Sequence, residues 1–184
     1  MTPLQDIVDR IAQSSAPGPT STRVIAVDGL GGAGKSTLAE RLGEALGSVA
    51  IVHTDDFANW TDSLDWWPRL IEEVLDPLSN GLTARFQRYD WDQRTVVEWL
   101  EVQPASYVII EGVSASRDAF QPYLAFSIWV ETPREERLKR GLERDGQAAH
   151  SQWLAWMAGE DAYVVREHPA CRADLVVRGT ESIQ

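Results

Sequence analysis

The sequence predicts an α/β protein with a mainly parallel, five-stranded sheet covered by helices on both faces. Short apolar segments rich in β-branched residues alternate with segments of helical periodicity along the 184 residues. A glycine-rich turn follows the first apolar segment, and acidic residues stand at or just after the ends of the next two. Alternating strands and helices indicate a parallel sheet, whose ligands lie at the carboxyl ends of the strands.

The predicted strands are short apolar runs at 24–27, 50–53, 107–111, 126–130 and 174–177. Helices are expected at 4–13, 35–46, 68–78, 93–101, 134–144 and 151–165, where apolar residues recur at helical spacing. Residues 14–22, rich in Ser, Thr, Pro and Gly, form a connector. We interpret 1–184 as a single domain, with the N-terminal helix and connector at 1–22 and a lid at about 132–146.

Composition argues against several classes of protein. The formal net charge of −11 disfavours a nucleic-acid-binding surface, because phosphate backbones require clustered Lys and Arg. No apolar run is long enough to cross a bilayer, and acidic residues interrupt the N-terminal segment, which disfavours a secretory signal. The single cysteine, Cys171, cannot form an internal disulfide. We expect a cytoplasmic protein without nucleic-acid or membrane partners, and a homodimer stays open.

The turn after the first strand matches the phosphate-binding pattern G-x-x-x-x-G-K-[ST] between a strand and a helix. Glycines let successive backbone N–H groups surround an anion at a helix N-terminus. Lys35 can reach the β- and γ-phosphates of a nucleotide, and the Ser36 hydroxyl can ligate Mg²⁺. The alternative is a glycine-rich turn that binds nothing. The residues predicted to bind ATP here are Gly29, Gly31, Gly32, Ala33, Gly34, Lys35, Ser36 and Thr37.

Carboxylates follow two further strands at the same predicted edge of the sheet. Asp55 and Asp56 come directly after the second strand, and Glu111 ends the strand YVIIE. A carboxylate at this edge can accept a proton from a hydroxyl group or contact Mg²⁺. Helix capping or turn chemistry is the alternative for the two aspartates. The predicted metal site comprises Ser36, Glu111 and Asp55.

These segments together resemble a known group of enzymes. DGLGGAGKSTLA, TDDF and VIIEG are similar to the corresponding segments of the uridine kinase, phosphoribulokinase and pantothenate kinase branch of P-loop kinases. The resemblance runs from roughly residue 23 to 177 and implies a three-layer P-loop NTPase fold. It also implies that Asp55, two residues before a Phe, is the catalytic base.

A predicted helix near residue 140 presents arginines at helical spacing. Arg137, Arg140 and Arg144 share one face, and we expect Leu138 and Leu142 to pack on roughly the opposite side. Such arginines can stabilise a phosphoryl group in transfer. The alternative is a solvated helix with Glu–Arg pairs, of which Glu136 with Arg140 is one. Uridine kinases carry a similar R-L-x-R-x-x-x-R-D lid, which implies catalytic roles for Arg137 and Arg140 and nucleotide binding by Arg144.

Two segments are candidates for the acceptor site. Asp65, before an aromatic residue and Pro68, resembles the position where uridine kinases hold sugar hydroxyls; a helix N-cap is the alternative. The segment that begins at Arg85 resembles the family's substrate segment, in which the Tyr contacts base or acceptor. Its predicted substrate residues are Arg85, Arg88 and Tyr89, with the arginines suited to an anionic acceptor.

One feature of this segment departs from the family. Uridine kinases place a pyrimidine-reading His after the Tyr-Asp pair, whereas this chain has Trp91-Asp92-Gln93-Arg94. Trp60, Trp66 and Trp91 lie near the candidate acceptor segments and could stack on a ring. We expect transfer of the ATP γ-phosphoryl group to a small-molecule hydroxyl with Mg²⁺, with a nucleoside-type acceptor favoured. A sugar, vitamin precursor or antibiotic as acceptor stays open, and so does a nucleotide-dependent switch.

Overall fold

The computed structural model describes residues 3–47, 49–59 and 64–181. A five-stranded sheet in the order β2-β5-β1-β6-β7 forms its centre, and all four neighbouring pairs are parallel. The strands are β1 (Arg23–Gly29), β2 (Ala50–His53), β5 (Tyr107–Gly112), β6 (Leu124–Glu131) and β7 (Leu175–Arg178). The predicted parallel five-stranded sheet is confirmed, with each strand within about two residues of its expected position.

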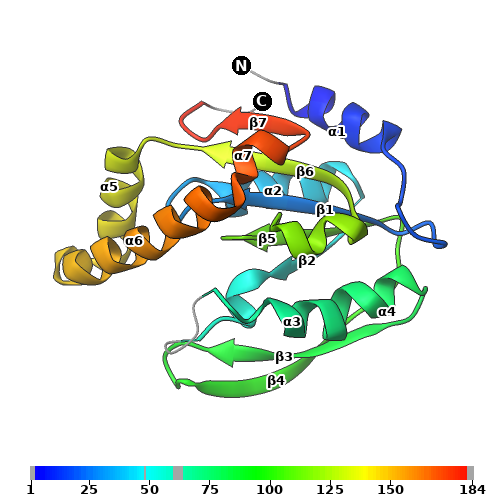
Figure 1. The fold of residues 1–184 in the computed structure, drawn as a ribbon, viewed down its shortest axis with the longest axis horizontal. Helices are drawn as coiled ribbons and strands as arrows, with labels where there is room; N and C mark the ends of the chain where they lie inside the picture. The colour runs from blue at the N-terminus through cyan, green and yellow to red at the C-terminus, as the bar shows by residue number, and fades with distance from the viewer. Residues whose placement is uncertain (1–2, 48, 60–63, 182–184) are drawn as a thin grey trace.

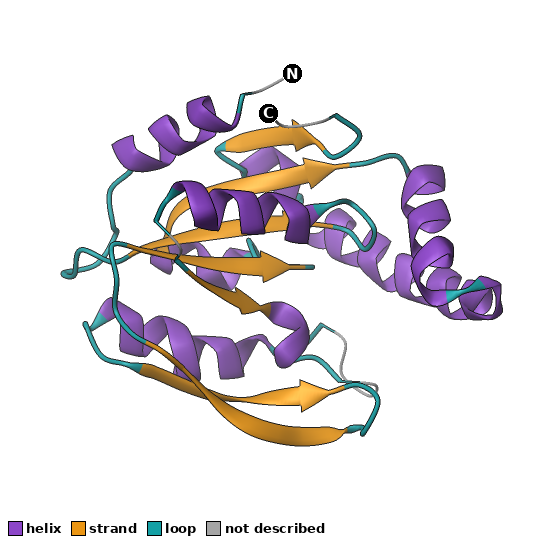
Figure 2. Ribbon diagram, turned by 180° about the vertical axis from the view of Figure 1, so that it is seen from behind, coloured by secondary structure: helices purple, strands orange, loops and turns teal. Residues whose placement is uncertain are grey.

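Helices cover both faces of this sheet (Figures 1 and 2). Side chains alternate along β1, so that Ile25 and Val27 point to one face while Val24 and Ala26 point to the other. The first face packs against α1 (Leu4–Gln13) and α2 (Lys35–Ala45). Ile7 and Ile11 of α1 are fully buried there, as the period of the N-terminal segment predicts.

The second face is covered by a helix that spans 67–79 and by the C-terminal helices. The first helix consists of α3 (Trp67–Leu70), a π-helical segment η2 (Ile71–Leu75) and α4 (Asp76–Ser79). The expected helix at 68–78 is therefore present, with one wide turn. Pro77 lies just beyond this turn and has no N–H to donate to the preceding turn, which favours a local π segment.

The prediction of a helix at 93–101 is wrong. This segment forms strand β4 (Thr95–Val102), which pairs antiparallel with β3 (Ala84–Asp90) in a separate two-stranded hairpin. β-Branched residues at 95–97 favour the strand, and pairing with β3 outweighs the weak helical period. The turn is shaped by Asp90, whose Oδ1 accepts hydrogen bonds from the backbone N–H groups of Asp92 and Gln93.

The remaining elements are helical segments in the connections between the strands. They are η1 (Thr54–Asp56), η3 (Asp118–Tyr123), α5 (Arg134–Asp145), η4 (Gln147–Ala149), α6 (His150–Glu167) and α7 (Pro169–Arg172). In Figure 1, α5 and α6 extend beyond the carboxyl ends of β5 and β6, and the hairpin β3–β4 lies below the sheet, on the far side of α3 and α4. Within the described ranges, no helix has the length and apolar character to span a membrane.

Candidate active site

The phosphate-binding loop connects β1 to α2, in the strand–turn–helix context that the motif requires. Gly32 has φ of +75°, and a Cβ atom at this position would lie 2.5 Å from the carbonyl oxygen of Arg137. Only glycine fits so close to the lid helix. The Lys35 side chain is buried, and its Nζ donates to the carbonyl oxygen of Leu30 at 3.2 Å. The ammonium group therefore lies against the loop, in reach of an anion held there.

Ser36 and Glu111 meet beside this loop. The Ser36 hydroxyl donates to Oε1 of Glu111 at 3.2 Å, and the other carboxylate oxygen is 2.8 Å from Nδ1 of His53. Burial raises the pKa of Glu111, but hydrogen bonds from His53 and Ser36 and the charge of Lys35 outweigh it and lower the pKa overall. Glu111 is thus held ionised next to the hydroxyl predicted to ligate a metal ion.

Asp55 lies in the η1 turn at the end of β2. The residue is exposed to solvent, yet the protein around its carboxylate reduces the hydration of that group and raises its pKa. The charge of Glu111 adds to this rise, whereas Lys35, His53 and Arg144 oppose it. These interactions place Asp55 in the electrostatic field of the phosphate-binding loop, the predicted metal residues and the lid.

Asp56 faces a different set of charges. Loss of hydration raises its pKa to about 6, Asp55 and Glu98 add to the rise, and His53 and Arg88 reduce it. Arg88 and Glu98 belong to the hairpin β3–β4. Asp56 therefore interacts electrostatically with the hairpin as well as with His53, whereas Asp55 interacts with Lys35 of the phosphate-binding loop and with Arg144 of the lid helix.

The raised pKa of Asp56 predicts how stability changes with pH. Because the folded chain holds this proton more tightly than the unfolded chain, whose pKa is near 3.8, stability falls as pH rises from about 4 to about 6. Asp56→Asn removes the unfavourable charge, so the variant is expected to have a higher melting temperature than wild type at pH 7.5. The difference should be only a few degrees, because solvent partly screens this half-buried site. Calorimetry at pH 4.5 should show a smaller difference, and an equal difference at both pH values would contradict the assignment.

Asp28 is a buried residue that the sequence analysis did not single out. It is fully buried in β1 and its carboxylate accepts five hydrogen bonds from four residues. The donors are Gly29 N at 2.6 Å, Ser114 N at 2.9 Å, Ser116 N at 3.0 Å, Ser116 Oγ at 2.7 Å and Tyr163 Oη at 2.7 Å. Burial raises its pKa against these hydrogen bonds. Asp28 thus ties the start of the phosphate-binding loop to the segment after β5 and to α6.

The lid helix α5 packs differently from the expectation. Its buried residues are Arg137 and Gly141, while Leu138 and Leu142 are only half-buried. A Cβ atom on Gly141 would lie 2.4 Å from the Trp153 indole, so glycine permits the close contact between α5 and α6. The leucine-packed interface is therefore wrong, and the arginine-bearing side is the one that faces the protein.

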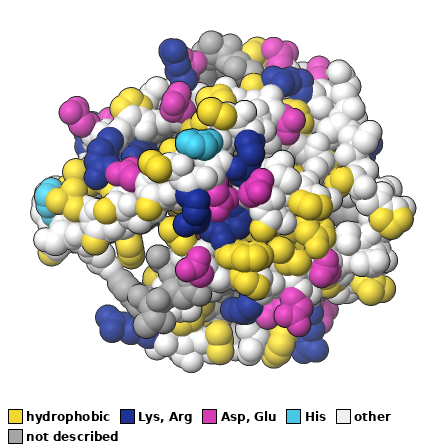
Figure 3. Space-filling model, viewed as in Figure 1, with side chains coloured by type: hydrophobic (Ala, Val, Ile, Leu, Met, Phe, Trp, Pro, Cys, Tyr) yellow, Lys and Arg dark blue, Asp and Glu magenta, His cyan; other side chains and the backbone are white. Residues whose placement is uncertain are grey.

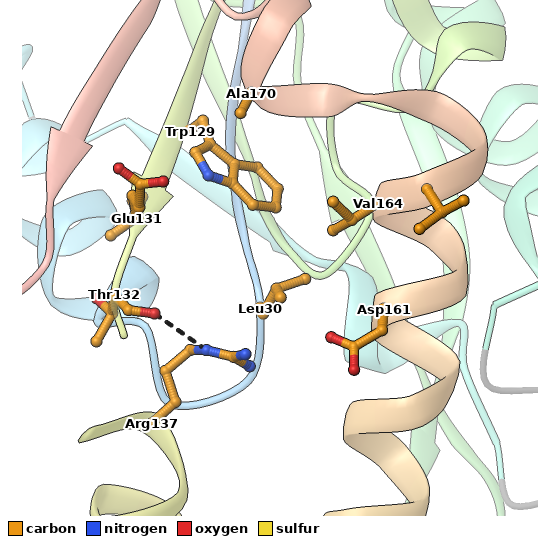
Figure 4. A pocket seen from close by; sticks show the side chains of 10 residues that line it. Leu30, Trp129, Glu131, Thr132, Arg137, Asp161, Val164 and Ala170 are labelled. Carbon is orange, nitrogen blue, oxygen red and sulfur yellow. Dashed lines mark hydrogen bonds between the residues drawn. The ribbon is translucent and has the colours of Figure 1, made fainter. Parts of the chain in front are cut away.

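Arg137 is enclosed by the protein. Its Nη1 lies 3.1 Å from Oε2 of Glu160, and its Nε donates to the Thr132 carbonyl oxygen at 3.2 Å. Oε1 of Glu160 in turn accepts a hydrogen bond from Gly31 N at 2.8 Å. Glu160 was not anticipated, and it links the lid, α6 and the phosphate-binding loop. Arg137 also borders a pocket of about 410 Å³ lined largely by apolar side chains, among them Leu30, Trp129 and Val164 (Figure 4).

The other two lid arginines are more accessible. Arg140 pairs with Glu136 at 2.9 Å, and its Nη1 donates to the Gly179 carbonyl oxygen at 3.1 Å and the Gly32 carbonyl oxygen at 3.4 Å. Arg144 pairs with Asp145 and lies over the Trp153 ring at 5.6 Å. Its charge also lowers the pKa of Asp55. Arg140 thus reaches the loop and Arg144 acts on the candidate base.

The structure separates the predicted acceptor residues. Arg85 lies over the exposed Trp99 at 4.5 Å and 3.7 Å from Glu101, on the side of β3 opposite the buried Phe86. Arg88 pairs with Glu98 at 2.9 Å. These two arginines are engaged with hairpin acids.

Tyr89, in contrast, lies close to the candidate base. Its ring meets the Trp91 ring edge-on at 5.5 Å, and Trp91 Nε1 donates to the Asp55 carbonyl oxygen at 3.1 Å. Trp91 also contacts Trp156 of α6, with ring centroids 6.5 Å apart. The hairpin tip and α6 therefore meet above the Asp55 turn. Asp65 is exposed directly before the buried Trp66, and Trp60 lies outside the described residues.

Charges of both signs mix on the face that carries α6 and α7. Figure 3 shows Lys and Arg side chains interspersed with Asp and Glu there.

Comparisons with known proteins agree with this architecture. A family model described as AAA domain matches residues 25–165. The uridine kinase of Mycoplasma genitalium is 28% identical over 145 residues, which cover 67% of each chain. The cytidylate kinase of Edwardsiella ictaluri is 34% identical over 129 residues, 67% of this chain and 56% of that enzyme. The inorganic pyrophosphatase TTM2 of Arabidopsis thaliana is 28% identical over 138 residues, and the chain spans only 20% of its length.

Solved structures extend the likeness to nearly the whole chain. A protein from Bacillus stearothermophilus described as a possible uridine kinase superposes with a TM-score of 0.70 at 22% identity, covering 94% of this chain and 96% of that one. The superposition shows that the two proteins share a fold. The family model matches more than half of the sequence. The chain therefore belongs to the AAA domain family and has the fold of the uridine kinase-like branch of P-loop kinases.

Proposed function

We propose that this protein is a kinase that moves the γ-phosphoryl group of ATP to a hydroxyl of a small, nucleoside-type molecule. The observation that carries the proposal is the position of Asp55, a carboxylate with a raised pKa within the electrostatic reach of Lys35 and Glu111. A phosphate-binding loop alone serves hydrolases, switches and kinases. A candidate base beside the loop adds the group that a transferase requires to activate the acceptor hydroxyl.

The residues beside the loop suit Mg²⁺ as the metal. Magnesium prefers hard oxygen ligands and takes only one or two from the protein, because nucleotide phosphates and water supply the rest. Across the described part of the chain no group of three or more His, Cys, Asp or Glu residues could hold a metal on its own, which a magnesium–nucleotide site does not need. Ser36, Glu111 and Asp55 would hold the ion, and the bound ion would neutralise charge on the phosphates.

The protein groups then have distinct roles in the proposed reaction. Asp55 orients the acceptor hydroxyl and takes its proton as the phosphoryl group arrives. Lys35 and Arg140, both in contact with the loop, stabilise the negative charge on the phosphates, and Arg144 acts from the lid side. Arg137 supports the loop through Glu160 and Gly31 and would contact phosphate only if that ion pair opened.

The acceptor class is inferred from the relatives and from the aromatic side chains near Asp55. Two of the relatives are named uridine kinase and cytidylate kinase, which favours a nucleoside-type acceptor. Tyr89 and Trp91 offer ring faces beside the Asp55 turn on which a base could stack. The cytoplasmic location and the homodimer stay predictions.

The test is ADP release from ATP and Mg²⁺ against a panel of nucleosides, sugars and vitamin precursors, with uridine and cytidine first. One panel member is expected to raise ADP release well above the rate without acceptor. The chain has only two lysines, the buried Lys35 and the exposed Lys139. Lys35→Met is expected to abolish this release, and Lys139→Met is the matched control that should retain it. Nucleotide binding without release for any acceptor would favour a switch instead.

A further inference from the structure

Arg117 is buried without the hydrogen bonds that a buried guanidinium requires. It follows β5 by five residues and its side chain is only 3% exposed. Among the described residues, neither Nε nor Nη2 has a hydrogen-bond partner. Arginine stays charged in proteins, and an unpaired buried charge strongly destabilises the folded state. A native structure tolerates such a group where a ligand completes it.

The two free nitrogens form the edge with which arginine grips a carboxylate in this same protein. Arg69 donates from Nε and Nη2 to the two oxygens of Glu73 at 3.0 and 2.8 Å. Arg144 does the same with Asp145 at 2.7 and 3.0 Å. Arg117 has the corresponding edge without an acceptor. Two parallel N–H donors are complementary to two oxygens of a carboxylate or a phosphate.

The acids nearest to Arg117 do not fill this edge. The charge of Glu167 raises the pKa of Arg117. The carboxylate oxygens of Glu167, however, accept hydrogen bonds from Asp118 N at 2.9 Å and from Arg166 Nη2 at 3.2 Å. Asp65 also contributes at longer range, and its side chain is exposed. Burial consequently lowers the pKa of Arg117 despite both acids.

Aromatic rings connect Arg117 to the candidate acceptor site. Its guanidinium lies 5.7 Å from the Trp67 ring and 6.0 Å from the Trp66 ring. The Trp66 ring packs at 6.0 Å from Phe57, two residues after Asp55. The stacking fixes the guanidinium plane, and the buried Nε and Nη2 edge stays without an acceptor. Arg117 is thus one ring layer away from the turn that carries the candidate base.

We propose that the Nε and Nη2 edge of Arg117 binds an oxyanion, carboxylate or phosphate, on the acceptor at a distance from its reacting hydroxyl. This inference rests on the proposed kinase function and narrows its acceptor to anionic molecules. It replaces Arg85 and Arg88, which are engaged by hairpin acids, as the anion-reading residue. It also offers a reason for the missing pyrimidine-reading His, because recognition of a charged group would supply the specificity instead.

The site can be tested without turnover. In ¹⁵N-labelled protein, the Arg117 Nε–H resonance is the one lost in Arg117→Lys, and it is followed while inorganic phosphate or acetate is added. A saturable shift is expected at millimolar concentration, with phosphate and acetate as separate arms that tell which oxyanion fits. The Arg69 Nε–H, already paired with Glu73, is the control that should not move. The proposal is overturned if neither anion shifts the Arg117 resonance. It is also overturned if the Arg117 and Arg69 resonances shift together without saturation.

Kinetics provide the second readout. The ADP-release panel is extended here to anionic molecules, nucleoside monophosphates and carboxylate-bearing vitamin precursors. For an anionic acceptor found in it, Arg117→Lys is expected to raise KM about 10- to 100-fold, as the loss of charge-assisted hydrogen bonds implies, with little change in kcat. The increase should be absent for a neutral analogue of that acceptor, and an equal KM effect on both overturns the proposal. Failure of the whole panel together with a saturable Arg117 shift would refute the kinase function and leave the anion site standing.

Discussion

Asp55→Asn is expected to lower kcat by about 10²- to 10⁴-fold in the ADP-release assay, the range associated with loss of a general base. Asparagine keeps the shape of the side chain but cannot take the proton of the acceptor hydroxyl. Affinity for a non-hydrolysable ATP analogue, measured without Mg²⁺ because Asp55 would also hold the ion, should change little, since Lys35 and the loop glycines are intact. Steady-state kinetics and calorimetric titration measure the two quantities.

The pH dependence distinguishes a base from a positioning group. The pKa of Asp55 is raised, and a base acts only when ionised, so log kcat/KM should rise with pH through that pKa and then level. This ascending limb is expected to vanish in Asp55→Asn. Asp56→Asn is the matched control, since Asp56 faces Arg88 and Glu98 of the hairpin, and its kcat should stay within about tenfold of wild type. A larger loss in Asp56→Asn than in Asp55→Asn would exchange the two roles.

Local sequence signals predict the sheet and the phosphate-binding loop well. Continuous burial along β1 and β5 follows from their apolar runs, and the glycines of the loop mark backbone conformations that other residues avoid. The pairing of Ser36 with Glu111 also follows from topology, because the parallel strands β1 and β5 end at the same edge. These features depend on neighbouring residues or on one strand pairing.

Other features depend on contacts between distant segments and escape such reasoning. The hairpin partner of β4 lies 5 to 18 residues away along β3, and that pairing adds to the β-branched residues at 95–97 to favour strand over helix at 95–102. Arg137 lies on the predicted face of its helix, but its enclosure by Glu160, 23 residues later, required the position of α6. Arg117 gives no signal in sequence, since its distinguishing property is the partner that it lacks. The one available hint for Asp28 is its place as the acid immediately before the loop.

Asp28→Asn is expected to destabilise the protein by about 3–5 kcal/mol. Oδ1 accepts from Gly29 N and Ser114 N, and Oδ2 accepts from Ser116 N, Ser116 Oγ and Tyr163 Oη. Whichever position the amide NH₂ of asparagine takes, it meets at least two donors. Each buried donor left without an acceptor costs about 1–3 kcal/mol. The melting temperature should fall by roughly 10 °C, measured by calorimetry at pH 7.5.

Tyr163→Phe is the graded control for this prediction, because it removes one donor and leaves the carboxylate and its four other hydrogen bonds in place. A loss of about 1–2 kcal/mol is expected. Because Gly29 N donates to Asp28, the asparagine variant should also weaken ATP binding. Tyr163→Phe leaves that hydrogen bond in place and should not change ATP binding. A melting temperature for Asp28→Asn within about 2 °C of wild type would mean that Asp28 is already protonated in the folded chain, in line with its raised pKa. The phosphate-binding loop would then depend on a neutral carboxyl group. In that case the stability of wild type should fall as the pH rises above 3.8, because aspartate in the unfolded chain loses its proton there while the folded chain keeps it.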